Sequence, residues 1–249
     1  MWDDAKQLNA IAAGLALIAA GALVAGGLTW LLRQPAFEFR EVVLMTPPAR
    51  ASAAHLEAVI RDEMTGTFFT MNLDRARAAL AKVPWVRRAS LSRQWPQRLE
   101  VTIEEYVPHA RWNGDALVNA EGEVFSADYD GDLPLLEGAD ARATEVTARF
   151  FEWSVALAPL SLALREIRVS PRGGWRLKAT GTSGPLDLEL GRDEPGERLA
   201  RFVAVYGRTI ETLARAGTRV DRVDLRYRNG FAARVPGFRE RPAKKAGAA

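Results

Sequence analysis

The sequence predicts an α+β protein in which one N-terminal transmembrane helix carries two small soluble domains. An uncharged apolar run near the N-terminus predicts the helix, and a β-α-α-β-β order over residues 37–107 predicts the first domain. Short strands with glycine-containing connections and two amphipathic helices follow over residues 108–236. Because the links between those later strands are short, we expect the second domain to contain an antiparallel sheet.

The run from Ala10 to Leu32 contains no charged residue and one polar residue, Thr29. At ~1.5 Å per residue, this run is long enough to cross a hydrocarbon layer about 30 Å thick. Trp30 and Arg33 at its C-terminal end are typical of a membrane–water boundary. We therefore assign residues 10–32 to a transmembrane helix preceded by a short N-terminal tail, residues 1–9.

A cleaved signal peptide is the alternative interpretation, because Ala25-Gly26-Gly27 provides a small-x-small pattern. The apolar region of a signal peptide is usually only ~7–15 residues long and follows a basic start. Charge does not decide the orientation, since Lys6 precedes the run and Arg33 and Arg40 follow it. A long C-terminal region can still be translocated largely regardless of its charge.

The first soluble domain is predicted from five consecutive patterns. Pro47-Pro48 ends the first strand, Ser52 and Asn72 precede the two helices, and Pro84 follows the second helix. Glu104 and Glu105 would lie on opposite faces of the last strand, so we interpret both as solvated charges. The expected elements are a strand at 37–45, a helix after 52, a helix from 72, and strands at 86–95 and 98–107.

The second domain is predicted to contain several short strands and two helices, one of them a long helix from Pro195 to at least Leu213. Asn229-Gly230, between strand-like runs, predicts a tight type I′ hairpin, because both of its central residues need positive φ. The strand after it should be a sheet edge. Residues 237–249 should form a disordered tail. The other expected strands are at 117–119, 123–126, 133–137, 167–169, 175–179, 186–190, 219–227 and 232–235, and the other helix ends before 159.

Several stretches of the first domain and of its junction resemble the signature stretches of one family. They are Gly66-Thr67-Phe68-Phe69-Thr70, Pro84-Trp85-Val86, Gln94-Trp95-Pro96, Leu99-Glu100-Val101 and Glu105-Tyr106-Val107-Pro108-His109-Ala110-Arg111-Trp112. In that order, they resemble the POTRA domain of the FtsQ/DivIB cell division proteins. Val223-Asp224-Leu225-Arg226-Tyr227, followed by Asn229-Gly230, resembles the C-terminal strands of the same family. Trp85, Trp95 and Trp112 are interpreted as packing residues rather than as partner contacts.

This resemblance implies a non-enzymatic scaffold of the divisome in the bacterial inner membrane. It implies a cytoplasmic N-terminus, a periplasmic bulk and a position at the division septum. The first domain would bind other divisome membrane proteins, and the C-terminal edge strand would bind FtsB within a complex with FtsL. Arg228 and Phe231 differ from the more acidic and smaller residues of the enterobacterial version. The implied partner-binding residues are Arg172, Trp175, Arg226, Tyr227, Asn229, Gly230, Phe231 and Ala232.

Packing of Tyr227 against Phe231 across the terminal hairpin is the structural alternative to that binding role. A POTRA-containing transport or assembly component is the functional alternative, although it predicts repeated units and a β-barrel. A membrane-bound hydrolase is less favoured, because nucleotide-binding loops and hydrolase signatures are absent from the sequence.

Composition excludes several other functions. The chain has no cysteine and two histidines, His55 and His109, neither of which has ligands at metal-binding spacing. The formal net charge is only +3, which does not indicate nucleic-acid binding. We therefore expect no catalytic residue, no metal and no cofactor.

Overall fold

The computed structural model describes residues 5–63 and 65–237. It begins with α1, Ala5–Leu32, in which residues Asn9–Leu32 have a mean hydropathy of 2.2 and are not buried. Within the described ranges, α1 is the only helix long and apolar enough to cross a membrane. The predicted helix is confirmed, and its length and composition are those of the one span of a single-pass membrane protein. The predicted disorder of the C-terminal tail concerns residues 238–249, which lie outside the described residues.

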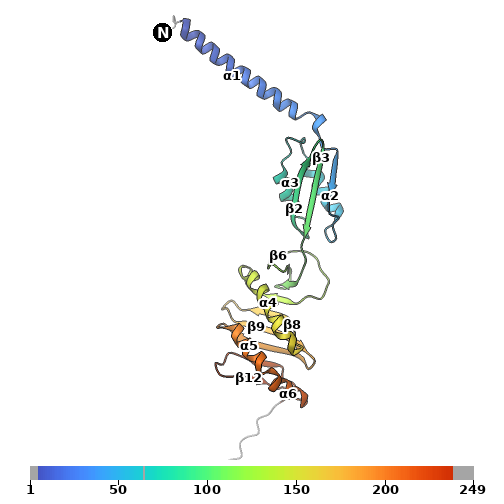
Figure 1. Cartoon of the computed structure of the whole chain (residues 1–249), viewed down its shortest axis with the longest axis vertical. Coiled ribbons are helices and arrows are strands. Elements are labelled where there is room, and N and C mark those ends of the chain that lie inside the picture. The colour runs from blue at the N-terminus through green and yellow to red at the C-terminus, as the bar shows by residue number, and fades with distance from the viewer. Residues whose placement is uncertain (1–4, 64, 238–249) are drawn as a thin grey trace, which may run out of the picture. The chain divides into compact units, whose positions relative to one another are not determined.

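The first domain has the predicted β-α-α-β-β order. Its sheet has the order β1-β3-β2, with β1 and β3 parallel and β2 and β3 antiparallel, and both helices lie over one face (Figure 1). The first strand is shorter than predicted: Phe37 belongs to a 3-10 turn, η1 Pro35–Phe37, and pairing with β3 covers only Glu41–Leu44. The elements are β1 Glu41–Leu44, α2 Ala53–Glu63, α3 Leu73–Leu80, β2 Val86–Gln94 and β3 Arg98–Glu105.

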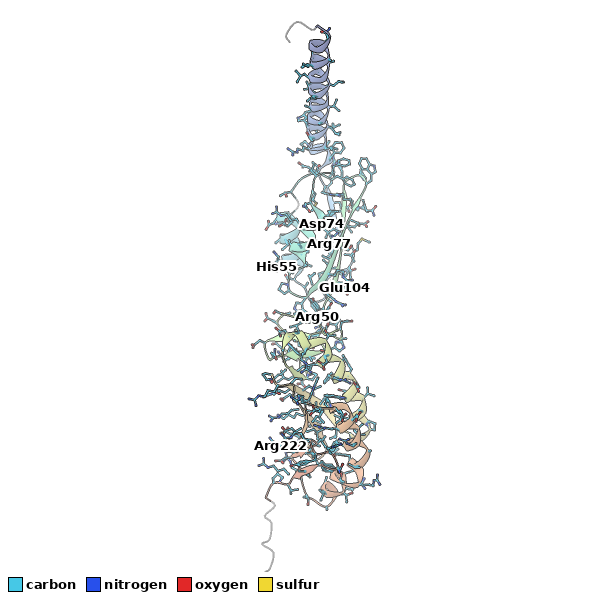
Figure 2. All side chains as sticks on the ribbon, turned by 90° about the vertical axis from the view of Figure 1, so that its left-hand side faces the viewer. Arg50, His55, Asp74, Arg77, Glu104 and Arg222 are labelled. Carbon is cyan, nitrogen blue, oxygen red and sulfur yellow. The ribbon has the colours of Figure 1, made fainter. Side chains whose placement is uncertain are left out.

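Local side chains begin both helices of this domain as the sequence predicts. The Ser52 hydroxyl accepts the His55 N–H at 3.3 Å, and the Asn72 side chain accepts the Arg75 N–H at 3.0 Å. Leu56 of α2 and Leu80 of α3 then pack onto the buried face of the sheet. On α3 itself, Asp74 and Arg77 form an exposed ion pair one helical turn apart (Figure 2).

Glu105 has a structural role that the sequence does not indicate. Its carboxylate accepts backbone N–H groups from three consecutive residues, Ala49, Arg50 and Ala51, at 2.8 to 3.1 Å. Such charge-assisted bonds are roughly twice as strong as neutral ones. The side chain thus holds the loop that leads into α2, and the interpretation of Glu105 as merely solvated is wrong.

The second domain is built on a nine-stranded sheet with the order β12-β11-β10-β9-β8-β7-β4-β5-β6. Its three helices are α4 Ala143–Leu157, α5 Pro195–Val205 and α6 Ile210–Arg215, and α4 and α5 pack over one side of the sheet (Figure 1). The strands are β4 Ala110–Trp112, β5 Ala116–Val118, β6 Val124–Phe125, β7 Leu135–Glu137, β8 Ala163–Val169, β9 Trp175–Gly181, β10 Gly184–Gly191, β11 Arg222–Asp224 and β12 Ala232–Arg234.

The α+β class is confirmed, but this sheet is mixed rather than wholly antiparallel. The strands joined by short turns are antiparallel as predicted, whereas β7–β8, β10–β11 and β4–β7 are parallel. Helix α4 connects β7 to β8, and α5 and α6 connect β10 to β11. Each is a crossover that returns the chain to the same end of the sheet, which parallel pairing requires.

The long helix predicted from Pro195 is interrupted. A 3-10 turn, η4, occupies Tyr206–Arg208, and Thr209 has non-helical dihedral angles, φ −121° and ψ −83°. Gly207 has low helix propensity, and the Thr209 hydroxyl donates to the Val205 carbonyl at 2.8 Å. Both features favour a break at this point, although the apolar spacing continues through it.

The core of the second domain lies between this sheet and its helices. Trp112, Trp153 and Phe202 are its largest fully buried side chains. The Trp112 indole N–H donates to the Asp140 carboxylate at 2.7 Å, which satisfies its polar atom inside the core. The packing role predicted for Trp112 is therefore confirmed.

Candidate partner-binding surface

The terminal strand β12 forms one edge of the second sheet, as the sequence predicts. It pairs with β11 in the antiparallel register Arg222↔Arg234 and Asp224↔Ala232. All three of its residues are exposed. An edge strand presents a row of unpaired backbone N–H and C=O groups, so β12 is a ready template for an added strand.

The segment between β11 and β12 is longer than the predicted hairpin. It spans residues 225–231, and neither Asn229 nor Gly230 has the positive φ of a type I′ turn. The prediction of that turn is therefore wrong. Both residues are exposed, and no heavy atom lies within 4 Å of the position that a Cβ on Gly230 would occupy.

The beginning of this segment is fixed by Arg226. Its guanidinium binds the Asp224 carboxylate through Nε at 2.9 Å and Nη2 at 2.6 Å, and it lies 3.4 Å from Glu189. Its backbone N–H also donates to Asp224 at 3.0 Å. The side-chain hydrogen bond from Arg226 lowers the pKa of the Asp224 carboxyl below its ordinary value. Arg226 therefore orients the loop, and the next side chain, Tyr227, is 58% exposed.

Phe231 closes the other end of the segment. Its ring packs edge-on against the fully buried Phe202 of α5, with centroids 6.2 Å apart, so this side chain is partly buried. Phe231 is thus anchored by Phe202, and not by Tyr227 as in the structural alternative to a binding role. A groove of about 470 Å³ lies between α5 and the loop, lined by Arg198, Arg201, Phe202, Ala204, Val205, Thr209, Leu225, Arg228, Asn229, Gly230 and Phe231.

Arg172 lies at the same end of the sheet as this loop. The register places Trp175 opposite Gly191, Glu189 opposite Asp224, and Asp224 opposite Ala232. Three strand spacings put β9 about 14 Å from β12. Arg172 is exposed in the turn before β9, so a partner that extends from the edge across the sheet end could reach it.

Trp175 does not lie on this surface. Its side chain is 3% exposed and packs edge-on against Trp153, with ring centroids 5.1 Å apart. The Arg142 guanidinium lies 5.0 Å from its ring centroid. Trp175 is a core residue, and the prediction that it contacts a partner is corrected.

The outer face of the sheet is the main competing surface. It has a shallow depression of about 230 Å³ lined mainly by charged side chains, and Arg222 lies there on the side away from the helices (Figure 2). Arg222 pairs with Asp187 at 3.9 Å, and Arg176 pairs with Glu189 at 3.4 Å. Because these cations are already paired, this face has little free charge to bind a polyanion.

Sequence reasoning missed the residues that support the candidate site. The sequence gives Arg198 and Arg201 no role in a site, but they border the groove, and the Arg198 guanidinium donates to the Leu190 carbonyl at 2.6 Å. The ion pair between Asp224 and Arg226 has one local signal in the sequence, because residues two apart along a strand lie on the same face. Glu189 joins that pair only through the parallel β10–β11 register, which no local pattern indicates.

Among residues 5–63 and 65–237, no group of three His, Cys, Asp or Glu side chains could hold a metal ion. What the described geometry offers is backbone pairing at β12, an exposed loop with Tyr227, and an apolar groove bordered by arginines.

Two family models match the chain. The model described as cell division protein FtsQ/DivIB, C-terminal, matches residues 110–226, and the FtsQ-type POTRA domain matches residues 37–106. The cell division protein FtsQ of Burkholderia pseudomallei is 37% identical over 246 residues, covering 96% of each chain. The FtsQ proteins of Nitrosospira multiformis and Coxiella burnetii are 35% and 34% identical, covering 94% and 88% of this chain and 99% and 88% of their own lengths. The chain therefore belongs to the FtsQ/DivIB family of cell division proteins.

Proposed function

We propose that this protein is a non-enzymatic scaffold of the divisome in the inner membrane. Its N-terminus lies in the cytoplasm, its two domains lie in the periplasm, and it is placed at the division septum. It bridges early and late division proteins: the POTRA domain contacts other divisome membrane proteins, and the second domain binds FtsB in a complex with FtsL.

The exposed edge strand β12 is the observation that carries this proposal. A segment of FtsB adds a strand to this edge, and its backbone groups pair with those of β12. Side chains around the edge supply specificity. Arg226 is fixed by Asp224 and Glu189, whereas Tyr227 projects into solvent next to it, and the groove beside Phe231 can accept an apolar side chain of the partner.

Co-purification with FtsB tests this surface. The variants Tyr227→Ala and Phe231→Lys should both lower the amount of FtsB recovered with the full-length protein. Val155→Ala is the matched control, because Val155 is an exposed apolar side chain on α4 of the same domain. Recovery of FtsB at the wild-type level with both variants would exclude the proposed surface.

Localisation tests the divisome role separately. A fluorescent fusion of the full chain should form a band at midcell in dividing cells. Uniform envelope fluorescence would instead agree with a transport or assembly component, an alternative that the FtsQ-type family matches do not favour.

A further inference from the structure

Five aromatic side chains gather at one end of the POTRA domain. Phe68 contacts Phe39, Phe69 and Trp95, with ring centroids 5.2 to 5.8 Å apart, and Phe37 contacts Phe69 at 5.3 Å. This aromatic cluster is not closed from solvent, because Trp95 is 69% exposed and Phe69 is 45% exposed. Trp95 is thus not the packing residue that the sequence suggested. A cluster with two such exposed rings is typical of a binding surface.

The aromatic cluster lies at the end of the domain that is joined to α1. Phe37 is only five residues beyond Leu32, so the two residues can be at most about 18 Å apart. The Thr67 hydroxyl donates to the Leu32 carbonyl at 2.6 Å, and the Phe68 N–H donates to the Phe37 carbonyl at 2.7 Å. The loop that carries Phe68 and Phe69 is therefore bonded directly to the end of the membrane helix.

Strand direction places Trp95 at the same end. β1 begins at Glu41, opposite Arg98, and β2 ends at Gln94, which is also opposite Arg98. The turn between β2 and β3 therefore adjoins the start of β1, and the Gln97 carbonyl accepts the Arg40 N–H at 2.9 Å. The opposite end of the sheet is where Val86 faces Glu105.

We infer that the aromatic cluster docks the POTRA domain onto the lipid bilayer that α1 spans, with Trp95 and Phe69 entering the boundary between headgroups and acyl chains. Aromatic rings, and tryptophan above all, are favoured at this boundary, because an apolar body meets lipid while the indole N–H stays hydrated. Trp30, two residues before the end of α1, is expected at the same boundary between headgroups and acyl chains.

Local charge indicates which lipid property matters. Arg33 and Arg40 are exposed near the cluster, but Glu38 is exposed between them, and Arg98 is paired with Glu41. Arg93, next to the end of β2, adds one more cation and donates to the Met71 carbonyl at 2.6 Å. The resulting net charge is far below that of a polybasic cluster of four or more cations, so attraction to anionic headgroups is weak. Burial of the rings supplies the binding, and zwitterionic lipid is sufficient for it.

The absence of cysteine from the chain makes a site-specific probe straightforward. Trp95→Cys and Phe69→Cys each leave the other four rings of the aromatic cluster in place. Each variant of the full chain is labelled with a polarity-sensitive fluorophore and reconstituted into phosphatidylcholine nanodiscs. Lys82→Cys is the matched control, because Lys82 is exposed next to the opposite end of the same domain.

Labels at positions 95 and 69 should be quenched by spin-labelled lipid and protected from aqueous iodide, and the label at position 82 should show the reverse. Adding anionic lipid should change neither result. Equal iodide quenching at positions 95, 69 and 82 would overturn the inference. Protection of position 95 that occurs in native membranes but not in pure lipid would also overturn it, because the occupant would then be a protein.

Discussion

Replacing Ala233 with proline should remove one outward backbone donor from β12 and leave the sheet intact. The Arg234 carbonyl accepts the Asp221 N–H at 3.2 Å, so the backbone groups of Arg234 face β11. Because these groups alternate in direction along a strand, the N–H and C=O of Ala233 face the free edge. Proline at this position therefore lacks the N–H that an added strand would use.

The expected loss of affinity follows from that single bond. A backbone hydrogen bond contributes about 0.5–1.5 kcal/mol net, and a carbonyl of the partner left buried without a donor costs about 1–3 kcal/mol. A loss near 1.4 kcal/mol corresponds to roughly a tenfold rise in the Kd for FtsB. The stability of the protein should change by less than about 0.5 kcal/mol, because Ala233 is exposed and its N–H makes no bond to β11.

The assay is a titration of the full-length protein in detergent with purified FtsB, together with the urea midpoint of each variant. Ala233→Thr is the control, because threonine keeps the N–H and suits an exposed strand. Wild-type affinity in Ala233→Pro would refute strand addition at β12. A similar loss in both variants would show that side-chain bulk, and not the backbone donor, is what matters.

Substitutions at three other positions test the structural roles assigned above. Trp175→Ala should lower the unfolding free energy by about 3–5 kcal/mol, because it leaves a cavity in the core. Trp175→Phe should retain FtsB binding. A folded Trp175→Phe variant that no longer binds FtsB would show that Trp175 contacts the partner after all. Arg226→Ala should lower the urea midpoint at pH 7 and should lower it progressively less as pH falls below about 4, because the pKa of Asp224 is depressed in the folded state and the stabilisation from the pair is lost as pH falls through that depressed pKa. An effect that does not change with pH would contradict the pairing. Glu105→Ala should destabilise the POTRA domain by about 2 kcal/mol, measured by hydrogen exchange of the loop before α2, and unchanged exchange would refute its role.

The elements that could be predicted are those with local signals. The helix caps at Ser52 and Asn72, the alternation along β3 and the length of α1 all follow from residues that are neighbours in the chain. Parallel pairing of β10 with β11 depends instead on where a crossover returns, which no local pattern states. The sheet was therefore predicted in its parts but not in its mixed arrangement.

The same distinction applies to the candidate site. Asn229-Gly230 favours a tight turn locally, but tertiary contacts fix the chain that leads into it. The Leu225 N–H donates to the Glu189 carbonyl at 2.8 Å, and the Arg226 side chain binds Asp224. Those contacts outweigh a turn preference. Trp175 was misplaced for a different reason. The family resemblance implied a partner contact, whereas the alternation of Trp175, Leu177 and Ala179 with Arg176 and Lys178 indicates a side chain that faces the core.

Strand addition at β12 would depend mainly on backbone groups rather than on the side chains of the edge. The second sheet has two edges, and β6 consists only of Val124 and Phe125, so β12 is the longer one. The family model ends at residue 226, before β12 begins. Recognition through backbone groups places little demand on the side chains of the strand that provides them, and Ala232 and Ala233 are small enough to admit a neighbouring chain. Strand addition is thus compatible with variable side chains on β12 itself. Asp224 and Arg226, which orient the loop that leads to β12, lie within the region that the family model matches.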